Sequence, residues 1–401
     1  MVRILSVVGA FLTVVLLVFL GWYFRPWSEY SPHEVLQSQR VEDRTVFYRQ
    51  METLYPYRQI SASPHVENLS RNIQDLDITY EYKGALRSIG SYAEDRAITG
   101  FIVVKGGEVV FEQYWRGEGP EDRHTSWSVA KSVVATLIGV ALQEGVVQSL
   151  DDKASTYAPI YQDTDFGNIT IRQLLMMSSG IDFVEDYETP DSDMRRLFFN
   201  TFLLQKDVDR FVRQFKRKSD PGQEFEYISP NTSVLGAVLT GAYGGRSLSS
   251  LVEEKIFAPM KMDAATWLLD RDTDEGKELA YCCLNMRLEE YAKIGLLYLK
   301  DGVVDGQRIL PPGWTKFVAT PPTPEHSPHQ GTEARPFGYG HHFWVAEGAG
   351  EAYFASGYNG QYIWIDPAHD VVVAMTGADR NLPNGHTEFL ALIQAAAKAA
   401  G

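Results

Sequence analysis

The N-terminus contains a run of residues that is too apolar to remain in water. Residues 4–24 read ILSVVGAFLTVVLLVFLGWYF and carry no charged side chain. At 1.5 Å per residue, a helix of about 21 residues is about 30 Å long, which matches the hydrocarbon thickness of a bilayer. Trp22, Tyr23 and Trp27 stand where aromatic side chains favour the membrane interface. We predict a membrane anchor over residues 1–27, with a transmembrane helix at about 4–24.

A cleaved signal peptide is the alternative for this segment. The run is longer than a usual signal-peptide core, and no small-x-small cleavage site follows it, which favours the uncleaved anchor. Arg3 and Arg25 flank the run on opposite sides. The positive-inside rule therefore orients the segment only weakly. The sequence predicts a single-pass membrane protein whose orientation is not determined by charge alone.

Strand patterns lie at both ends of the remaining chain. Two β-rich runs, residues 100–105 and 108–115, are joined by Gly106-Gly107, which predicts a hairpin. Further strands are expected late in the chain, at residues 340–345, 352–355, 361–365 and 371–375. Because strands from both ends must meet in one sheet, the sheet is expected to be mainly antiparallel.

Helical patterns fill the middle of the chain and its C-terminus. They occur at residues 126–142, 171–177, 247–257, 288–299 and 388–399. The order predicts an α+β domain over residues 97–401, in which helices flank the sheet and a helical lobe occupies about 151–285. Residues 28–96 are polar with no sustained period, and we expect a lead-in segment that wraps the domain.

Composition excludes several classes of partner and cofactor. The net charge of −15 argues against nucleic acid, because phosphate binding needs clustered Lys and Arg. The nine histidines show no ligand spacing such as H-E-x-x-H, so no metal or other cofactor is expected. Cys282 and Cys283 are adjacent, and neighbouring cysteines bridge only through a strained eight-membered ring. We expect two buried thiols, which leaves the redox compartment open.

Ser128 and Lys131 form the most informative pair in the chain. The helix expected at residues 126–142 is apolar nearly all round, so it must be buried, and positions three apart share a face. Burial lowers the pKa of a lysine, which can then act as the base that a serine nucleophile needs. A capping serine with a surface lysine has the same spacing. The apolar surroundings of Lys131 favour the catalytic interpretation.

Two later segments carry further candidate residues. Tyr227 and Ser229 lie about a hundred residues on, in a loop that enters an apolar helix. Taken alone, Tyr227 is better explained as a packed aromatic. Residues 356–360, SGYNG, precede a late strand. Small residues there let a substrate lie against the strand edge, and a backbone N–H near Tyr358 would complete an oxyanion hole.

In this order the three segments resemble the S-x-x-K, Y-x-N and K-T-G signature of serine β-lactamases and penicillin-binding proteins. The resemblance covers roughly residue 98 to the C-terminus. Within that superfamily, the local sequences are most similar to the 6-aminohexanoate-dimer hydrolase branch. The similar stretches are HTSWSVAK at 124–131, EDY at 185–187, a Y-x-S second motif and a G-x-x-G-Q third region.

The resemblance implies a β-lactamase/transpeptidase-like fold, an acyl-serine mechanism and an extracytoplasmic catalytic domain. It makes Ser128 the nucleophile, and it gives general-base and general-acid duties to Lys131 and Tyr227. The backbone N–H groups of Ser128 and Tyr358 would form the oxyanion hole. Tyr187 is a candidate gate, although a loop aromatic that only packs explains it equally well. The expected substrate contacts are Ser229, Tyr187, Ser356, Gly357 and Asn359.

Two positions depart from the family pattern. Ala355 stands at the K-T-G lysine, and Ser229 stands at the asparagine of Y-x-N. In β-lactam-directed members, that lysine grips the substrate carboxylate, so its loss argues against β-lactamase activity. We therefore expect a membrane-anchored serine hydrolase whose partner is a small ester or amide.

Two alternatives to this function stay open. One is a cell-wall D-alanyl peptidase or β-lactamase-type enzyme. The other is a non-catalytic, penicillin-binding-like module, which would be expected to have lost Ser128, Lys131 or Tyr227 and has lost none of them. The sequence determines neither the substrate nor the oligomeric state.

Overall fold

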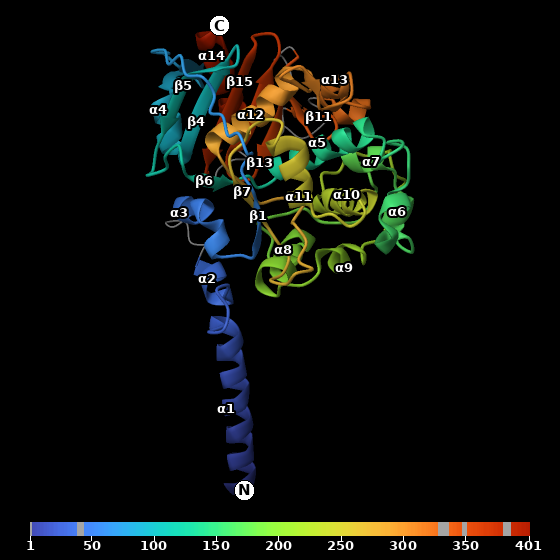
Figure 1. Ribbon diagram of the computed structural model, residues 1–401. Helices are drawn as coiled ribbons and strands as arrows, with labels where there is room; N and C mark the ends of the chain where they lie inside the picture. Colours follow the sequence, from blue (N-terminus) through green and yellow to red (C-terminus); the bar gives the residue numbers. More distant parts are fainter. Residues whose placement is uncertain (1, 38–43, 328–336, 347–350, 380–385) are drawn as a thin grey trace.

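A seven-stranded antiparallel sheet forms the centre of the folded body, with strand order β11-β12-β13-β14-β15-β4-β5. The computed structural model describes residues 2–37, 44–327, 337–346, 351–379 and 386–401. The strands of this sheet are β4 (Ile98–Lys105), β5 (Glu108–Tyr114), β11 (Phe337–Tyr339), β12 (Trp344–Ala346), β13 (Tyr353–Gly357), β14 (Gln361–Asp366) and β15 (Val371–Gly377). Early and late parts of the chain thus meet where β4 pairs with β15 (Figure 1). The expected α+β class is confirmed.

The sheet is buried on both faces, and the alternation of side chains explains how. On β4, Ile102 and Val104 face the core that contains α5 (Val129–Gln143) and α12 (Leu288–Leu299). Phe101 and Val103 face the opposite core, which α14 (His386–Ala400) covers. Successive side chains of a strand point to opposite faces, so β4, β13, β14 and β15 each contribute to both cores. The sheet is therefore the middle layer between two sets of helices, as Figure 1 shows.

The expected hairpin is confirmed, and one expected strand is wrong. Gly106 and Gly107 both have positive φ and join β4 to β5. Residues 340–345 are not one strand, because 340–343 form a turn between β11 and β12. The N–H groups of His341 and His342 bond to the carbonyls of Val318 and Leu175, at 3.0 Å each, instead of to a neighbouring strand. Contacts with distant helices thus override the local strand pattern.

Thirteen helices accompany α1 in the described part of the chain. The remaining ones are α2 (Pro32–Gln37), α3 (Arg44–Arg49), α4 (Ile89–Asp95), α6 (Ala154–Tyr157), α7 (Ile171–Leu175), α8 (Asp193–Phe198), α9 (Val208–Val212), α10 (Ser229–Ala242), α11 (Leu248–Val252) and α13 (Trp314–Ala319). Short 3₁₀ or π turns are η1 (Met51–Thr53), η2 (Pro159–Tyr161), η3 (Asp165–Asn168), η4 (Phe199–Leu203), η5 (Glu253–Phe257) and η6 (Pro324–His326). Helices α6 to α11 form the expected lobe.

A second sheet lies beside the lobe, and no period in the sequence predicted it. Its four antiparallel strands run in the order β1-β7-β8-β6. They are β1 (Tyr57–Ile60), β6 (Arg123–Thr125), β7 (Ala265–Leu268) and β8 (Leu284–Arg287). Two hairpins pair β2 (Thr79–Tyr82) with β3 (Ala85–Ser88) and β9 (Val303–Val304) with β10 (Gln307–Arg308). The segment before residue 97 therefore supplies strands and helices and does more than wrap the domain.

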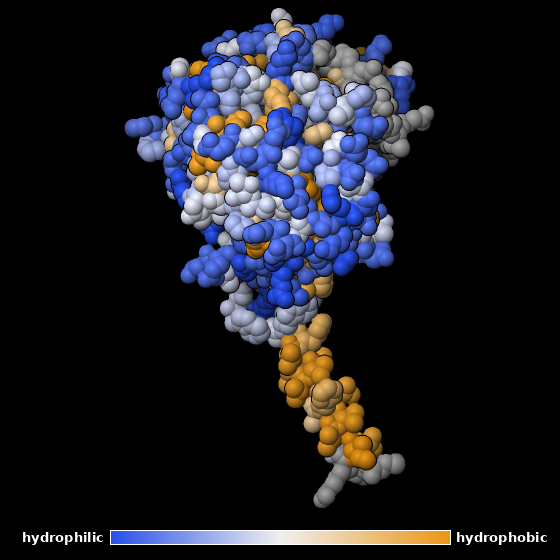
Figure 2. Space-filling model, turned by 90° about the vertical axis from the view of Figure 1, so that its right-hand side faces the viewer, coloured by the Kyte–Doolittle hydropathy of each residue, from blue (hydrophilic) through white to orange (hydrophobic). Residues whose placement is uncertain are grey.

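Helix α1 (Val2–Phe24) projects from the body, and Figure 2 shows it as an apolar stalk. Over the described ranges, Ile4–Phe24 is the one stretch of helix long and apolar enough to cross a membrane, and a signal sequence meets the same criteria. Its side chains are not buried against the body. At its base, the Arg25 guanidinium donates to the carbonyl of Leu203 in the lobe, at 2.8 Å. The stalk is thus attached directly to the helical lobe.

Candidate active site

A cavity of about 430 Å³ opens between the central sheet and the helical lobe. Its lining comes from the start of α5, from the loops before α8 and α10, and from strands β11 to β13 with the residue after β13. The lining residues are Ser128, Glu185, Tyr187, Phe225, Glu226, Tyr227, Phe337, Trp344, Phe354, Ser356, Gly357 and Tyr358. Segments that are far apart in the sequence thus bring six of the expected residues to one cavity: Ser128, Tyr187, Tyr227, Ser356, Gly357 and Tyr358.

Ser128 lies where the chain leaves β6 and enters α5. The preceding residue, Trp127, has a φ of 42°, in the left-handed region that a bulky side chain adopts only at a cost of about 1–3 kcal/mol. The packing of its ring against Tyr48, with centroids 5.4 Å apart, helps to hold this conformation. Ser126 is fixed to β8, because its N–H donates to the Leu284 carbonyl at 2.9 Å. Ser128 is therefore presented at the cavity by a rigid bend.

Lys131 is 2% exposed, and its amine lies directly behind the serine. Nζ is 3.0 Å from the Ser128 hydroxyl oxygen and 2.8 Å from the Tyr281 carbonyl oxygen. Burial lowers the pKa of Lys131 to about 8, and the negative charge of Glu185 opposes this shift. A neutral amine at this distance is able to take the serine proton.

Tyr227 stands on the other side of the amine, in the loop before α10. The Lys131 Nζ lies 5.1 Å from the centroid of its ring. The ring stacks on Trp344 at 5.5 Å and contacts the edge of Tyr339 at 6.0 Å. These aromatic contacts fix the ring at the cavity wall. Tyr227 is thus both packed and part of the cavity lining that contains Ser128.

Glu185 accepts three hydrogen bonds from two residues of the site, and the sequence did not single it out as a functional residue. Its carboxylate accepts hydrogen bonds from the Ser229 hydroxyl at 2.6 Å, the Ser229 N–H at 2.8 Å and the Tyr187 hydroxyl at 2.7 Å. Burial, followed by the charge of Glu185, raises the pKa of Tyr187 far above its ordinary value. The Tyr187 hydroxyl therefore stays protonated and donates. The only sequence signal for Glu185 was its place in the EDY stretch.

Tyr187 packs as well as lining the cavity. Its ring stacks on Tyr358 with centroids 4.8 Å apart, and the Tyr358 hydroxyl donates to Glu188 at 3.3 Å. The two tyrosines connect the lobe to the end of β13 across the cavity. A substrate that enters here meets aromatic walls on both sides.

The end of β13 lies against the bend that carries the serine. A Cβ on Gly357 would lie 2.3 Å from the Ser126 carbonyl oxygen, so only glycine permits this approach. Ser356 and Gly357 line the cavity, and Tyr358 follows at the strand end. Ala355 is fully buried, within the core cluster that contains α5. The K-T-G lysine position is therefore closed off from the cavity.

Two expected substrate contacts lie outside the cavity. The Ser229 side chain is fully buried, and its hydroxyl is occupied by Glu185. Asn359 is 1% exposed, and its amide bonds to the Tyr48 hydroxyl at 2.7 Å. With the amide oriented to satisfy both of its ends, it also donates to the Asp379 carbonyl. Neither side chain is among those that line the cavity: Ser229 orients Glu185, and Asn359 stabilises the turn between β13 and β14.

Cys282 and Cys283 are buried as expected, but the expectation of free thiols is wrong. The two sulfurs form a disulfide between adjacent residues. The bond lies one residue after the carbonyl that accepts from Lys131. Across the residues that the structure describes, no group of three or more His, Cys, Asp or Glu side chains is arranged to bind a metal.

Comparison with known proteins identifies the family. The β-lactamase family profile matches residues 85–397, which is most of the chain. The chain belongs to the β-lactamase family. Among curated relatives of this family member, the 6-aminohexanoate-dimer hydrolase of Paenarthrobacter ureafaciens is 29% identical over 290 residues, which are 70% of this chain and 72% of the relative. The resemblance that the three motifs indicated is thus confirmed.

Solved structures share the fold of this β-lactamase family member. A provisional 6-aminohexanoate-dimer hydrolase from Bacillus anthracis superposes with a TM-score of 0.78 at 23% identity, covering 88% of this chain and 93% of that one.

A second curated relative, a D-aminopeptidase of Brucella canis, is 27% identical over 176 residues, which are 42% of this chain but only 32% of the relative. The chain spans about a third of that peptidase, so the substrate of the peptidase is not transferred to this chain.

We predict that replacing Glu185 with glutamine moves the acid limb of the kcat/KM profile to lower pH. Lys131 must be neutral to act as base, so the rate rises with pH through its pKa. The Glu185 charge raises that pKa, and removing the charge lowers it. The quantity to measure is the pH at the midpoint of the acid limb, which does not depend on how far the maximal kcat/KM falls.

Glu226→Gln is the matched control. Glu226 also lines the cavity, but its carboxylate pairs with Lys218 at 2.7 Å and is not among the groups that shift the pKa of Lys131. Its limb midpoint should match that of the wild type. An unmoved midpoint in Glu185→Gln, or an equal shift in both variants, would contradict this account of the site.

Proposed function

We propose that the chain is a membrane-anchored serine hydrolase that cleaves small esters or amides through an acyl-serine intermediate. The observation that supports it most is the 3.0 Å contact between the Ser128 hydroxyl and a buried amine at the wall of a cavity. A serine becomes a nucleophile only where a base takes its proton. Relatives named as hydrolases support the same reaction class.

Acylation would begin with proton transfer from the Ser128 hydroxyl to the neutral amine of Lys131. The serine oxygen then attacks the carbonyl carbon of the substrate and forms a tetrahedral intermediate. Its oxyanion would be bound by the backbone N–H groups of Ser128 and Tyr358, which lie on facing segments because Gly357 approaches Ser126 so closely. Such donors typically contribute a factor of about 10²–10³ in rate.

The leaving group needs a proton when the intermediate collapses. Tyr227 would relay the proton from Lys131, and its position supports this role, because its ring lies beside Nζ and lines the same cavity as Ser128. Water then attacks the acyl-serine in the second half of the reaction, and the same two residues return the proton to Ser128. Glu185 would act as a positioning residue, because it holds Tyr187 and the start of α10 in place.

The cavity favours neutral substrates over anionic ones. The described lining contains no Lys or Arg but includes the carboxylates of Glu185 and Glu226. Its other walls are largely aromatic, which suits an acyl chain or an uncharged amide. The relative named 6-aminohexanoate-dimer hydrolase acts, by its name, on an amide dimer, and this supports amides as part of the substrate class.

The disulfide supports an extracytoplasmic position for the hydrolase domain. Disulfides persist in oxidising compartments such as the periplasm and are rare in the cytosol. The apolar helix Ile4–Phe24 would then be an uncleaved anchor with the body on the outer side. Resistance of the full chain to alkaline extraction from membranes, with an N-terminus that still begins at Met1, would support the anchor. A shortened N-terminus would show a signal sequence instead.

We predict that Ser128→Ala lowers ester turnover by at least about 10³-fold while leaving the fold intact. A slow acylating ester should add its acyl mass to Ser128. Ser126→Ala is the control for mass labelling, because the Ser126 hydroxyl is fully buried and accepts from the Leu284 N–H at 3.0 Å. Acyl label on Ser126 or Ser132 would refute the assignment. A folded chain that is never acylated would favour the non-catalytic binding module.

We also predict a preference against negative charge. The kcat/KM for p-nitrophenyl butyrate should exceed that for the mono-p-nitrophenyl ester of succinate by at least about tenfold. The reason is that a desolvated carboxylate without a cation costs more than about 1.4 kcal/mol. Glu226→Gln should reduce this ratio, whereas Glu188→Gln, outside the cavity lining, should not. If nitrocefin is hydrolysed faster than the butyrate ester, a β-lactamase-type enzyme becomes the better assignment.

A further inference from the structure

The disulfide between Cys282 and Cys283 lies in a short segment that contacts the catalytic machinery at both ends. Before it, the Tyr281 carbonyl accepts the hydrogen bond from Lys131 at 2.8 Å. After it, Leu284 exchanges two hydrogen bonds with Ser126, at 2.9 and 3.0 Å. Only the two bonded cysteines separate these contacts. The segment therefore sets the distance between the Tyr281 carbonyl, which holds Lys131, and the Leu284 backbone, which holds the bend before Ser128.

The backbone of this segment is unusual and well anchored. Cys283 has a φ of 71°, a left-handed conformation that side chains other than glycine rarely adopt. The Cys282 carbonyl accepts from the Trp267 indole at 2.9 Å, and the Cys283 carbonyl accepts from the Leu268 N–H at 3.1 Å. A bond between adjacent cysteines closes a small ring and restricts the backbone of both residues. The ring thus selects a conformation that an open chain would not favour.

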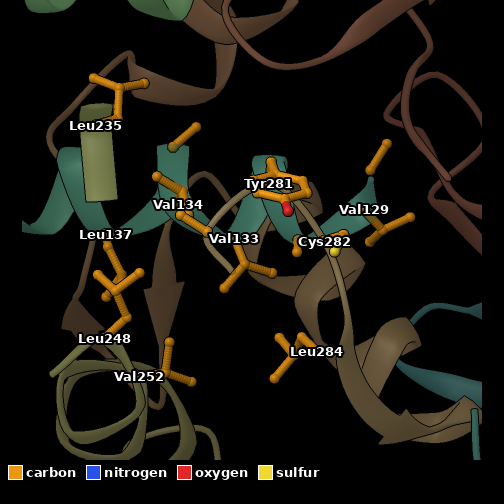
Figure 3. Packing of buried hydrophobic residues seen from close by; sticks show 14 of the residues in the cluster. Val129, Val133, Val134, Leu137, Leu235, Leu248, Val252, Tyr281, Cys282 and Leu284 are labelled. Carbon is orange, nitrogen blue, oxygen red and sulfur yellow. The ribbon is translucent and has the colours of Figure 1, made fainter. Parts of the chain in front are cut away.

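The segment lies against the helix that carries the lysine. Figure 3 shows Tyr281 and Cys282 beside Val129 and Val133 of α5, and these residues share one core cluster. The cysteines are 3% and 0% exposed, so the bond is covered by the core. Movement of this segment would displace the Tyr281 carbonyl and so change the hydrogen bond that the Lys131 amine donates to it.

We propose that the Cys282–Cys283 disulfide positions the catalytic lysine, by holding the Tyr281 carbonyl against Nζ and the Leu284 backbone against Ser126. The inference rests on the acyl-serine mechanism proposed above and adds a covalent element to it. With the ring closed, the amine has a fixed partner on one side and Ser128 on the other. With the ring open, the segment relaxes and water reaches the amine.

The charge environment of Lys131 determines what relaxation would do. The groups that face its amine are Glu185, the rings of Tyr227 and Tyr281, and His342. Burial lowers the pKa of His342 to about 3, so that imidazole is neutral at working pH. Desolvation is the main cause that lowers the pKa of Lys131. Water entering the segment would raise that pKa and reduce the neutral fraction at pH 7.

The test uses the full chain in detergent micelles, with Cys282→Ser, Cys283→Ser and the double variant. The acid limb of kcat/KM should move to higher pH in each, and the rate at pH 7 should fall about tenfold with little change in KM. Val252→Ala is the matched control, because Val252 is fully buried in the same core cluster but lies on α11. The Val252→Ala variant should have a lower melting temperature but an unchanged midpoint pH for the acid limb of kcat/KM.

Chemical reduction of the wild-type disulfide provides a second test in case the cysteine variants do not fold. A phosphine with water converts the disulfide into two thiols and is itself oxidised to the phosphine oxide. Because the bond is buried, the wild type is reduced while unfolded in denaturant and is then refolded; it should gain two hydrogens in intact mass and show the same shift of the acid limb, reversed by reoxidation. Untreated wild type with two free thiols, or variants and reduced protein with an unmoved limb, would overturn the inference. A wild type that turns over no ester would instead refute the proposed function.

Discussion

The buried amine of Lys131 is the interaction on which the arrangement of the site depends. A lysine side chain at 2% exposure is tolerated in an apolar helix only where its amine has partners. Ser128 and the Tyr281 carbonyl are those partners, and removing one from such a buried group costs about 1–3 kcal/mol. The start of α5 and the segment after the lobe are thereby coupled. Burial lowers the pKa of the lysine, and the hydrogen bonds of its amine hold these two parts of the chain together.

The central sheet supplies the opposite wall of the site, and its construction explains why that wall is stable. β4 and β15 join the two ends of the domain, and both faces of every central strand are covered. A sheet covered on both faces has little freedom to shift, because slipping by one residue would exchange its two cores. The end of β13 therefore approaches Ser126 at a constant distance, and Gly357 permits that distance.

The sequence predicted those parts of the fold that depend on local pattern. The β4–β5 hairpin, α5, α12 and the last two strands followed from periodicity and turn residues, and Ser128, Lys131 and Tyr227 followed from motif order. Features that depend on distant contacts were not predictable in this way: β1 pairs with a strand about 200 residues away, and residues 340–343 bond to helices. The motif around Asn359 predicted a substrate contact, but its side chain is buried and bonds to Tyr48, which is far away in the sequence. The sequence signalled Glu185 only through the EDY stretch, because its role depends on hydrogen bonds with Ser229, 44 residues away.

The bond between Arg25 and the Leu203 carbonyl has a consequence for where the protein works. For a chain inserted through α1, this hydrogen bond would link the lobe to the end of the membrane-spanning helix. The folded body would then move in the plane of the membrane, close to the lipid headgroups. Molecules that partition to that layer would meet the protein at a higher local concentration than those in the surrounding fluid. Hydrophobic esters concentrated near the bilayer would thus be sampled first, whatever the intrinsic preference of the cavity.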